Sequence, residues 1–217
     1  MDPTSILFSP PRNVPKIVLK GLSKPWFELG IEPRAIGRLG PDEEGGMRYA
    51  GKVNDCDGWE TLLCRAEAEP MQAVHFYSRV AQDDLYVYQW TERGERRLSA
   101  ELGNGRLRYF ESDDYPVGRY QVALMLALTV AADVDVAAYG KDYDEELFVA
   151  LDSVALLDKL RQGTLMTKWT PAVYMISTRL MGKAEVEAAI ARNAAWHLKY
   201  FITTSGYHVL SQYAGGE

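Results

Sequence analysis

The sequence predicts an α+β fold, in which an antiparallel β meander over roughly residues 47–112 packs against a largely helical C-terminal half. Short runs of alternating apolar and polar residues come before residue 112 and are typical of half-buried strands. Long runs of helix-forming apolar residues come only after residue 118. Strands followed by helices indicate α+β rather than an alternating parallel fold, and a length of 217 residues suits a single domain.

The first 46 residues hold seven prolines and the pair Gly45–Gly46. Proline fixes φ and removes a backbone donor, so we expect a Pro/Gly-rich irregular segment over residues 1–46 that wraps the body of the domain. Trp26, Phe27 and Leu29 are its expected anchors, and Lys16–Lys20 is a candidate short strand.

Four alternating runs form the expected meander. Gln72–Val80 and Asp84–Thr91 each place one set of residues on either face. Arg96–Leu102 and Arg106–Glu111 follow, joined by a glycine–asparagine–glycine sequence at residues 103–105. Because asparagine and glycine tolerate positive φ, this join predicts a hairpin.

The second half favours helices. Gly118–Ala132 is apolar on most sides and predicts a helix buried against the sheet, and Val134–Tyr139 is a candidate strand after it. Asp152–Gln162 predicts a short amphipathic helix. The run from Thr170 to Gly182 reads as a helix or as a β-branched strand, and Lys183–Phe201 carries the most regular helical spacing.

Charge and cysteine content exclude several classes of function. The net charge of −6 repels nucleic acid, and the basic cluster Arg93–Arg97 is too short to offset it, so any partner is expected to be neutral or basic. Cys56 and Cys64 cannot form a disulfide framework. The apolar run Val122–Ala132 is too short to cross a membrane, and the N-terminus does not resemble a signal peptide, so we expect a cytoplasmic protein.

Catalytic motifs are missing from the sequence. It contains no phosphate loop, nucleotide-binding glycine fingerprint, nucleophile elbow or zinc-protease helix, so we expect no cofactor and no catalytic residue. His75, His197 and His208 lack an orienting third residue at a telling spacing and are expected to be structural. An enzyme that uses His75 with a carboxylate, or with Cys64, stays an alternative.

Carboxylates gather in four places: Asp42, Glu43 and Glu44; Asp83 and Asp84; Asp113 and Asp114; and Asp142, Asp144, Glu145 and Glu146. Runs of like charge usually stay in water, so we expect solvated loops. The last group offers hard oxygen ligands for a divalent cation but lacks the spacing of a calcium loop. A metal-dependent hydrolase or nuclease is therefore an alternative, and no metal site is predicted.

Aromatic residues are abundant, with 13 tyrosines and five tryptophans. Tyr86, Tyr88 and Trp90 share one face of a predicted strand, either as its core side or as an exposed surface of the kind that protein interfaces use. The facing of Leu85 and Val87 decides between the two. If that aliphatic pair packs under the helix after residue 118, the aromatic trio lies on the opposite face.

In its compact, acidic and motif-free character the chain resembles the immunity proteins that bacteria keep against secreted toxins; the likeness lies in composition and in no motif. It implies a non-catalytic inhibitor that is steered to a basic toxin domain by charge and then buries an aromatic cluster against it. A homo-oligomer with a symmetric aromatic interface is a further alternative. The candidate partner-binding residues are Asp42, Glu43, Glu44, Tyr86, Tyr88, Trp90, Asp113, Asp114, Asp142, Asp144, Glu145 and Glu146.

Overall fold

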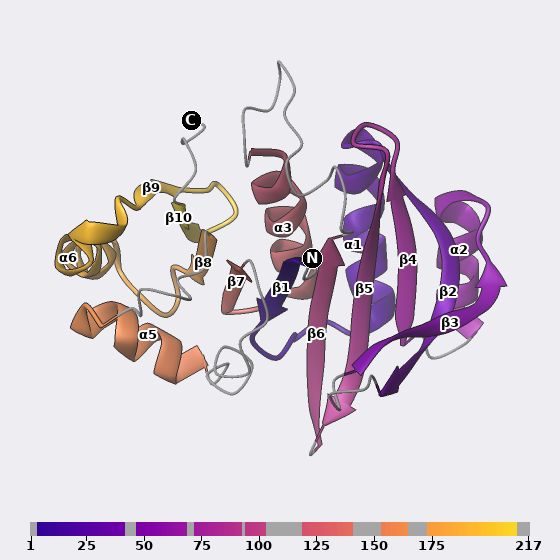
Figure 1. The fold of residues 1–217 in the computed structure, drawn as a ribbon, viewed down its shortest axis with the longest axis horizontal. Coiled ribbons are helices and arrows are strands. Elements are labelled where there is room, and N and C mark those ends of the chain that lie inside the picture. Colours follow the sequence, from indigo (N-terminus) through magenta and orange to yellow (C-terminus); the bar gives the residue numbers. More distant parts are fainter. Residues whose placement is uncertain are drawn as a thin grey trace.

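The fold is α+β, as the sequence predicts. The computed structural model describes residues 4–41, 47–68, 72–92, 94–102, 119–140, 153–164 and 173–211. Its strands form one ten-stranded sheet in the order β3-β2-β4-β5-β6-β1-β7-β8-β10-β9, in which all neighbouring pairs run antiparallel (Figure 1). The strands are β1 (Thr4–Phe8), β2 (Ile31–Pro41), β3 (Met47–Asp55), β4 (Ala73–Ser78), β5 (Asp83–Glu92), β6 (Glu95–Leu102), β7 (Val136–Gly140), β8 (Val173–Ser177), β9 (Lys199–Ile202) and β10 (Tyr207–Ser211).

Helices cover different faces of the sheet at its two ends (Figure 1). One core cluster joins the sheet to the first three helices, and a second cluster lies against the last two at the end formed by β7, β8, β10 and β9. Alternate residues of β8 enter the two clusters, so the cores lie on opposite faces. The helices are α1 (Pro15–Glu28), α2 (Gly58–Ala68), α3 (Arg119–Ala132), α5 (Ser153–Gln162) and α6 (Lys183–Arg192).

The expectation of irregular structure over residues 1–46 is wrong for the part that the structure describes, which holds β1, α1 and β2. Pro15 stands at the start of α1, where its missing N–H costs nothing. Pro33 lies beside a register shift in the pairing of β2 with β4, a position that a strand proline tolerates. The proposed strand Lys16–Lys20 is part of α1, whose Trp26 is an anchor because its ring is buried against Phe76.

The meander is confirmed for β4, β5 and β6, whereas the run Arg106–Glu111 and the turn before it lie outside the described residues. The predicted helix Lys183–Phe201 ends at Arg192, and β9 follows from Lys199. His197 takes a positive φ of 51° between them, which breaks the helical path. Between Thr170 and Gly182 the strand alternative is correct, because all five residues of β8 are buried between β7 and β10.

The end of the sheet around β2 and β3 curls over its neighbours. The pairing of β2 with β3 shifts register between Ile36 and Gly37 and again between Arg38 and Leu39. Such bulges bend a strand and increase its twist. As a result β3 crosses in front of β5 (Figure 1), and the ring of Tyr49 on β3 reaches Tyr86 on β5. The curl creates a concave surface on the side of the sheet away from α1 and α3.

Candidate functional site

The facing of β5 settles where its aromatic residues lie. Leu85 and Val87 are buried in the core cluster that contains α1 and α3. Because side chains alternate along a strand, Tyr86, Tyr88 and Trp90 belong to the opposite, concave face. Of the two alternatives drawn from the sequence, the one that places the aromatic trio on the face away from the core helices is therefore correct. Tyr88 itself is only 3% exposed.

Four rings from three strands form an aromatic cluster on this face, made of Tyr49, His75, Tyr86 and Tyr88. The His75 and Tyr86 rings stack with centroids 4.7 Å apart, and Tyr86 stacks on Tyr88 at 6.3 Å. Tyr49 closes over Tyr86 at 5.2 Å. The side chains of Tyr49, His75 and Tyr86 are half-buried. Part of the ring surface of the cluster is therefore exposed to solvent, although the rings pack against one another.

Small residues beneath the cluster make room for it. Gly37 of β2 lies opposite Ala73 of β4, and Ala73 lies opposite Tyr88. A Cβ atom on Gly37 would stand 2.0 Å from Cε2 of Tyr49. The absence of a side chain at position 37 therefore allows the Tyr49 ring to lie across β2 and reach Tyr86.

A histidine–carboxylate pair borders the cluster. His75 Nε2 lies 2.7 Å from Asp84 Oδ1, and the hairpin of β4 and β5 sets this contact by pairing His75 with Tyr86. The side chain of His75 is 23% exposed and that of Asp84 is 46% exposed. Asp84 therefore retains carboxylate surface that is open to a partner.

The local field around Tyr86 is negative. Burial raises the pKa of the Tyr86 hydroxyl, and the charges of Asp84 and Glu101 raise it further. Glu101 on β6 lies opposite Tyr86 in the sheet and accepts a 2.8 Å hydrogen bond from the Tyr88 hydroxyl. A cation placed beside the Tyr86 hydroxyl would therefore meet two carboxylates.

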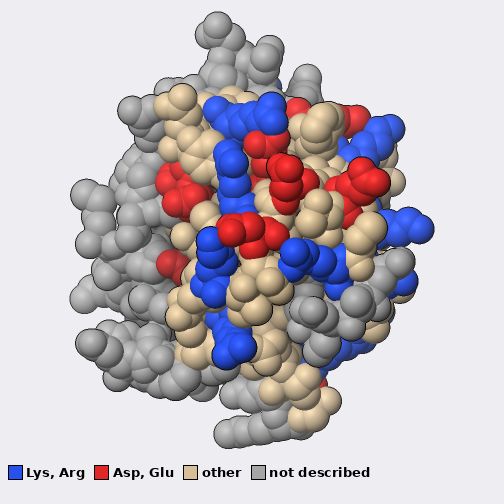
Figure 2. Space-filling view, turned by 90° about the vertical axis from the view of Figure 1, so that its right-hand side faces the viewer, with Lys and Arg blue, Asp and Glu red and all other residues tan. Residues whose placement is uncertain are grey.

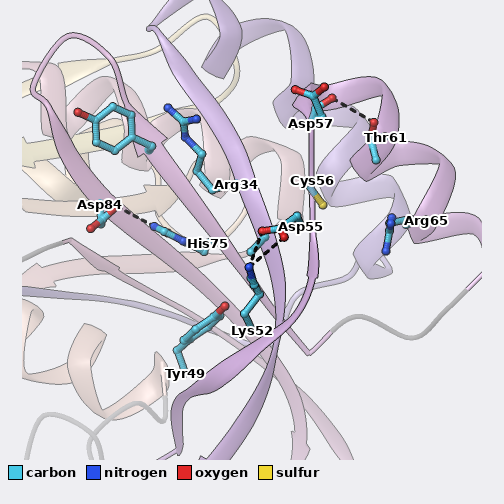
Figure 3. A pocket seen from close by; sticks show the side chains of 12 residues that line it. Arg34, Tyr49, Lys52, Asp55, Cys56, Asp57, Thr61, Arg65, His75 and Asp84 are labelled. Atoms are coloured by element: carbon cyan, nitrogen blue, oxygen red, sulfur yellow. Dashed lines mark hydrogen bonds and ion pairs between the residues drawn. The ribbon is translucent and has the colours of Figure 1, made fainter.

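His75 and Asp84 also line an open hollow of about 780 Å³ that extends toward α2 (Figure 3). Both charge signs line it: Lys52 bonds Asp55 at 2.8 Å, and the guanidinium of Arg34 lies 4.9 Å from the ring centroid of Tyr77. Figure 2, which views the end carrying α2, β2 and β3, shows acidic and basic side chains interspersed without a patch of one sign.

A thiol and a threonine hydroxyl also line the hollow. Burial raises the pKa of the Cys56 thiol, which keeps it protonated near neutral pH, and the Thr61 hydroxyl donates to the Asp57 carbonyl. Cys64 is exposed on α2 and does not line the hollow. Within the described ranges no three His, Cys, Asp or Glu side chains are placed to hold a metal ion.

Comparisons with known proteins add little. No protein-family model matches the sequence, and no curated protein sequence matches it. Among solved structures, a T6SS protein of Pseudomonas aeruginosa is similar with a TM-score of 0.49 and 11% sequence identity, over 96% of this chain and 67% of that one. A likeness at this level does not establish a shared fold, and no property of that protein carries over. None of the described helices is long and apolar enough to cross a membrane.

The structure brings only part of the predicted site together. Tyr86 and Tyr88 belong to the aromatic cluster, and Trp90 lies further along β5, half-buried and opposite Arg97. The remaining candidates lie outside the described residues: Asp42, Glu43, Glu44, Asp113, Asp114, Asp142, Asp144, Glu145 and Glu146. The sequence did not point to Tyr49, because only the curl of β3 brings it to β5.

The other two histidines have no place in the site. His208 is buried in β10, where its Nε2 donates to the Met181 carbonyl at 2.8 Å. Its Nδ1 then accepts from the Tyr200 hydroxyl at 2.9 Å, so both ring nitrogens are satisfied within the fold. His197 is exposed in the turn before β9. His208 is structural, as the sequence predicts.

Proposed function

We propose that the protein is a non-catalytic binding protein that inhibits another protein by covering it with the concave face of its sheet. The observation that carries the proposal is the aromatic cluster of half-buried Tyr49, His75 and Tyr86 and buried Tyr88, set beside open carboxylate surface on the side away from α1 and α3. Tyr49 and His75 of this cluster also line the open hollow, and tyrosines are among the residues that dominate binding energy at protein interfaces.

The partner recognised here is a basic protein. A lysine or arginine side chain of that partner would lie beside the Tyr86 hydroxyl, near Asp84 and Glu101, where the charge of the two carboxylates favours it. The end of the molecule in Figure 2 carries mixed charge, so it provides no local patch that would attract a basic partner. Attraction over longer range therefore comes from the net charge of −6 of the whole chain.

In this role the protein acts in the cytoplasm in the manner of an immunity protein, by masking a toxin domain that is basic around its active site. The acidic runs at Asp42–Glu44, Asp113–Asp114 and Asp142–Glu146 complete the proposed contact. They would steer the partner through their charge, which affects association rate and salt dependence more than final affinity.

The test is capture of a partner followed by measurement with variants. The tagged full chain is used to isolate binding proteins from its own source cells, and each candidate is titrated calorimetrically. Tyr86→Ala is expected to weaken the true complex by about 2 kcal/mol or more, as for an aromatic anchor. Gly37→Ala, which displaces the Tyr49 ring, should weaken it less, and added salt should weaken it throughout.

Glu187→Lys supplies the control, because this exposed residue of α6 lies over the other end of the sheet and undergoes the same kind of charge reversal as Asp84→Lys. Asp84→Lys should weaken the complex and Glu187→Lys should leave it unchanged. Equal effects of the two reversals, or a complex that tolerates Tyr86→Ala, would show that the concave face is not the binding surface.

One observation favours a second candidate, a hydrolase with His75 as general base. Its Nε2 lies 2.7 Å from Asp84, the kind of contact that orients a catalytic histidine. This function requires an enzymatic turnover that His75→Gln abolishes. The same variant must keep the stability of the unmodified protein. Partner binding that survives His75→Gln, with no such turnover on ester or phosphodiester substrates, would exclude it.

A further inference from the structure

A second surface lies on the opposite side of the sheet, between α1 and α3. The two helices run antiparallel: Asn13, before α1, bonds the Ala131 carbonyl at 2.8 Å, and Trp26 bonds the Leu124 carbonyl at 3.2 Å. Between their outer faces lies an open groove of about 620 Å³. This groove is separate from the aromatic cluster and has no part in the function proposed above.

The lining of the groove is mainly apolar, and its polar members are Asn13, Glu28 and Ser205. Its walls include Ile17, Leu126 and Val130, with Ala123 and Ala127 between them. Ile17 is 50% exposed and Val130 41% exposed. Of the eight large hydrophobic residues that are exposed in the described part of the chain, four belong to α1, its N-cap or α3. Two of these four, Ile17 and Val130, line the groove, and exposed apolar residues on both of its walls are typical of an interaction surface.

The sequence of α1 shapes the groove at a cost to the helix itself. Gly21 and Pro25, one turn apart, both line it, and each is unfavourable inside a helix. A Cβ on Gly21 would lie 3.0 Å from Cβ of Ala131, so glycine allows the two helices to approach closely. Pro25 has no N–H to donate to the Gly21 carbonyl, which leaves that oxygen without its helical donor.

A row of lysines borders this groove on one side only. Lys16, Lys20 and Lys24 are spaced four residues apart on α1, and all three are exposed. Each lysine is three or four positions away from a residue that lines the groove, so the row lies on the exposed side of α1 next to the groove. On the other side, α3 carries no charged residue after Arg119, and Glu28 is the one acid among the groove residues.

We propose that this groove binds an amphipathic helix of another protein, with acidic residues along one edge of its apolar stripe. A trough between two helices matches a third helix, whereas a flat membrane surface would not fill it. The lysine row complements acidic residues on that edge. A second copy of this chain fits less well, because it would bring its own Lys20 and Lys24 to the contact.

The test uses two fluorescent synthetic peptides with the full-length protein. Both carry the same helical stripe of leucine and alanine, flanked by glutamate in one peptide and by lysine in the other. Fluorescence anisotropy should show the glutamate peptide binding about tenfold more tightly or better, from two exposed ion pairs and the removal of repulsion. Lys20→Glu combined with Lys24→Glu should reverse that order, and Val130→Glu should abolish binding of both.

Other outcomes would overturn the proposal. Equal affinity for both peptides would show that the groove has no charge preference. Binding that Val130→Glu leaves intact would show that the groove is not the binding site. A concentration-dependent dimer in sedimentation velocity that Val130→Glu dissolves would assign the groove to a second copy. Binding to anionic lipid vesicles in place of the peptides would assign it to a membrane surface. Since Ile17, Val130 and the lysines are exposed, these variants leave the core intact, and Tyr86→Ala should affect none of the readouts.

Discussion

Two buried tyrosines of the sheet differ in a single hydrogen bond. The Tyr207 hydroxyl donates to the Val134 carbonyl at 2.9 Å, whereas the Tyr174 hydroxyl is buried without a hydrogen-bond partner among the described residues. A buried polar group without a partner costs stability. We therefore expect Tyr174→Phe to leave the free energy of unfolding unchanged or to raise it by up to about 2 kcal/mol.

Tyr207→Phe is the matched control, since it removes the same oxygen from a similarly buried ring that does donate a hydrogen bond. It should lower the free energy of unfolding by about 1 kcal/mol in denaturant titrations. If Tyr174→Phe destabilises the protein as much as Tyr207→Phe does, the Tyr174 hydroxyl has a favourable interaction in the fold and the expectation is wrong.

At the residue scale the sequence predicted part of the candidate site. The alternation along Asp84–Thr91 correctly separated Leu85 and Val87 from the aromatic trio, because period-two patterns are local. The contact of His75 with Asp84 requires the register of a hairpin, and that of Tyr49 with Tyr86 requires the curl of β3. Neither contact can be predicted from the residues of one strand, because each depends on how two strands are placed.

At the scale of elements, α5 ends against the C-terminal end of α6. The Asn193 amide donates to the Leu160 carbonyl at 2.8 Å, and a Cβ on Gly163 would stand 2.9 Å from the Arg192 carbonyl oxygen. Gly163 has a φ of 75°, while Gly58 has a φ of 83° with no atom within 4 Å of its added Cβ. Both replacements by alanine therefore carry the same conformational strain, and only one carries a clash.

We expect Gly58→Ala to cost about 1 kcal/mol of unfolding free energy, the price of a left-handed residue with a side chain. Gly163→Ala should cost at least about 1 kcal/mol more, because the backbone oxygen it meets cannot move without shifting α6. Thermal and denaturant unfolding of the two variants would check this. Equal losses of unfolding free energy in the two variants would mean that the junction of α5 and α6 accommodates the added methyl group without a further loss of stability.

Elements with a strong local signal were predicted well, and those that depend on neighbours were not. The helix α3 is largely apolar, and it ends at Ala132 as predicted. The helix α1 was missed because its prolines read as breakers, although Pro15 occupies the tolerant first turn. The strand β9 was read as helix because Ala-rich α6 precedes it, and only pairing with β10 makes Lys199–Ile202 extended.

At the scale of the whole molecule, one sheet separates two cores and two surfaces. The concave aromatic face and the groove between α1 and α3 lie on opposite sides, so each can be altered by an exposed residue without touching the other. Sequence composition gave the net charge but could not place these surfaces, because both arise where segments distant along the chain meet. A protein with two such faces can bind one partner on each of them.

Burial of phenol and thiol groups makes the whole fold sensitive to alkaline pH. Burial raises the pKa of Tyr174 and Tyr207 above 10.0, and that of Cys56 above 9.0. These groups stay protonated in the folded chain but ionise in the unfolded chain, so the unfolded state binds fewer protons. The stability they contribute is full below their unfolded pKa values and is lost as the pH rises toward the folded ones.

We therefore expect the free energy of unfolding to begin falling near pH 9 and to fall more steeply above pH 10, the unfolded values of thiol and phenol. Each fully buried tyrosine contributes a slope of about 1.4 kcal/mol per pH unit in that window. Denaturant titrations across the range measure the slope, and Tyr174→Phe should reduce it by one such share. A stability that stays level to pH 11, or a slope that Tyr174→Phe leaves unchanged, would show that the Tyr174 phenol ionises within the fold.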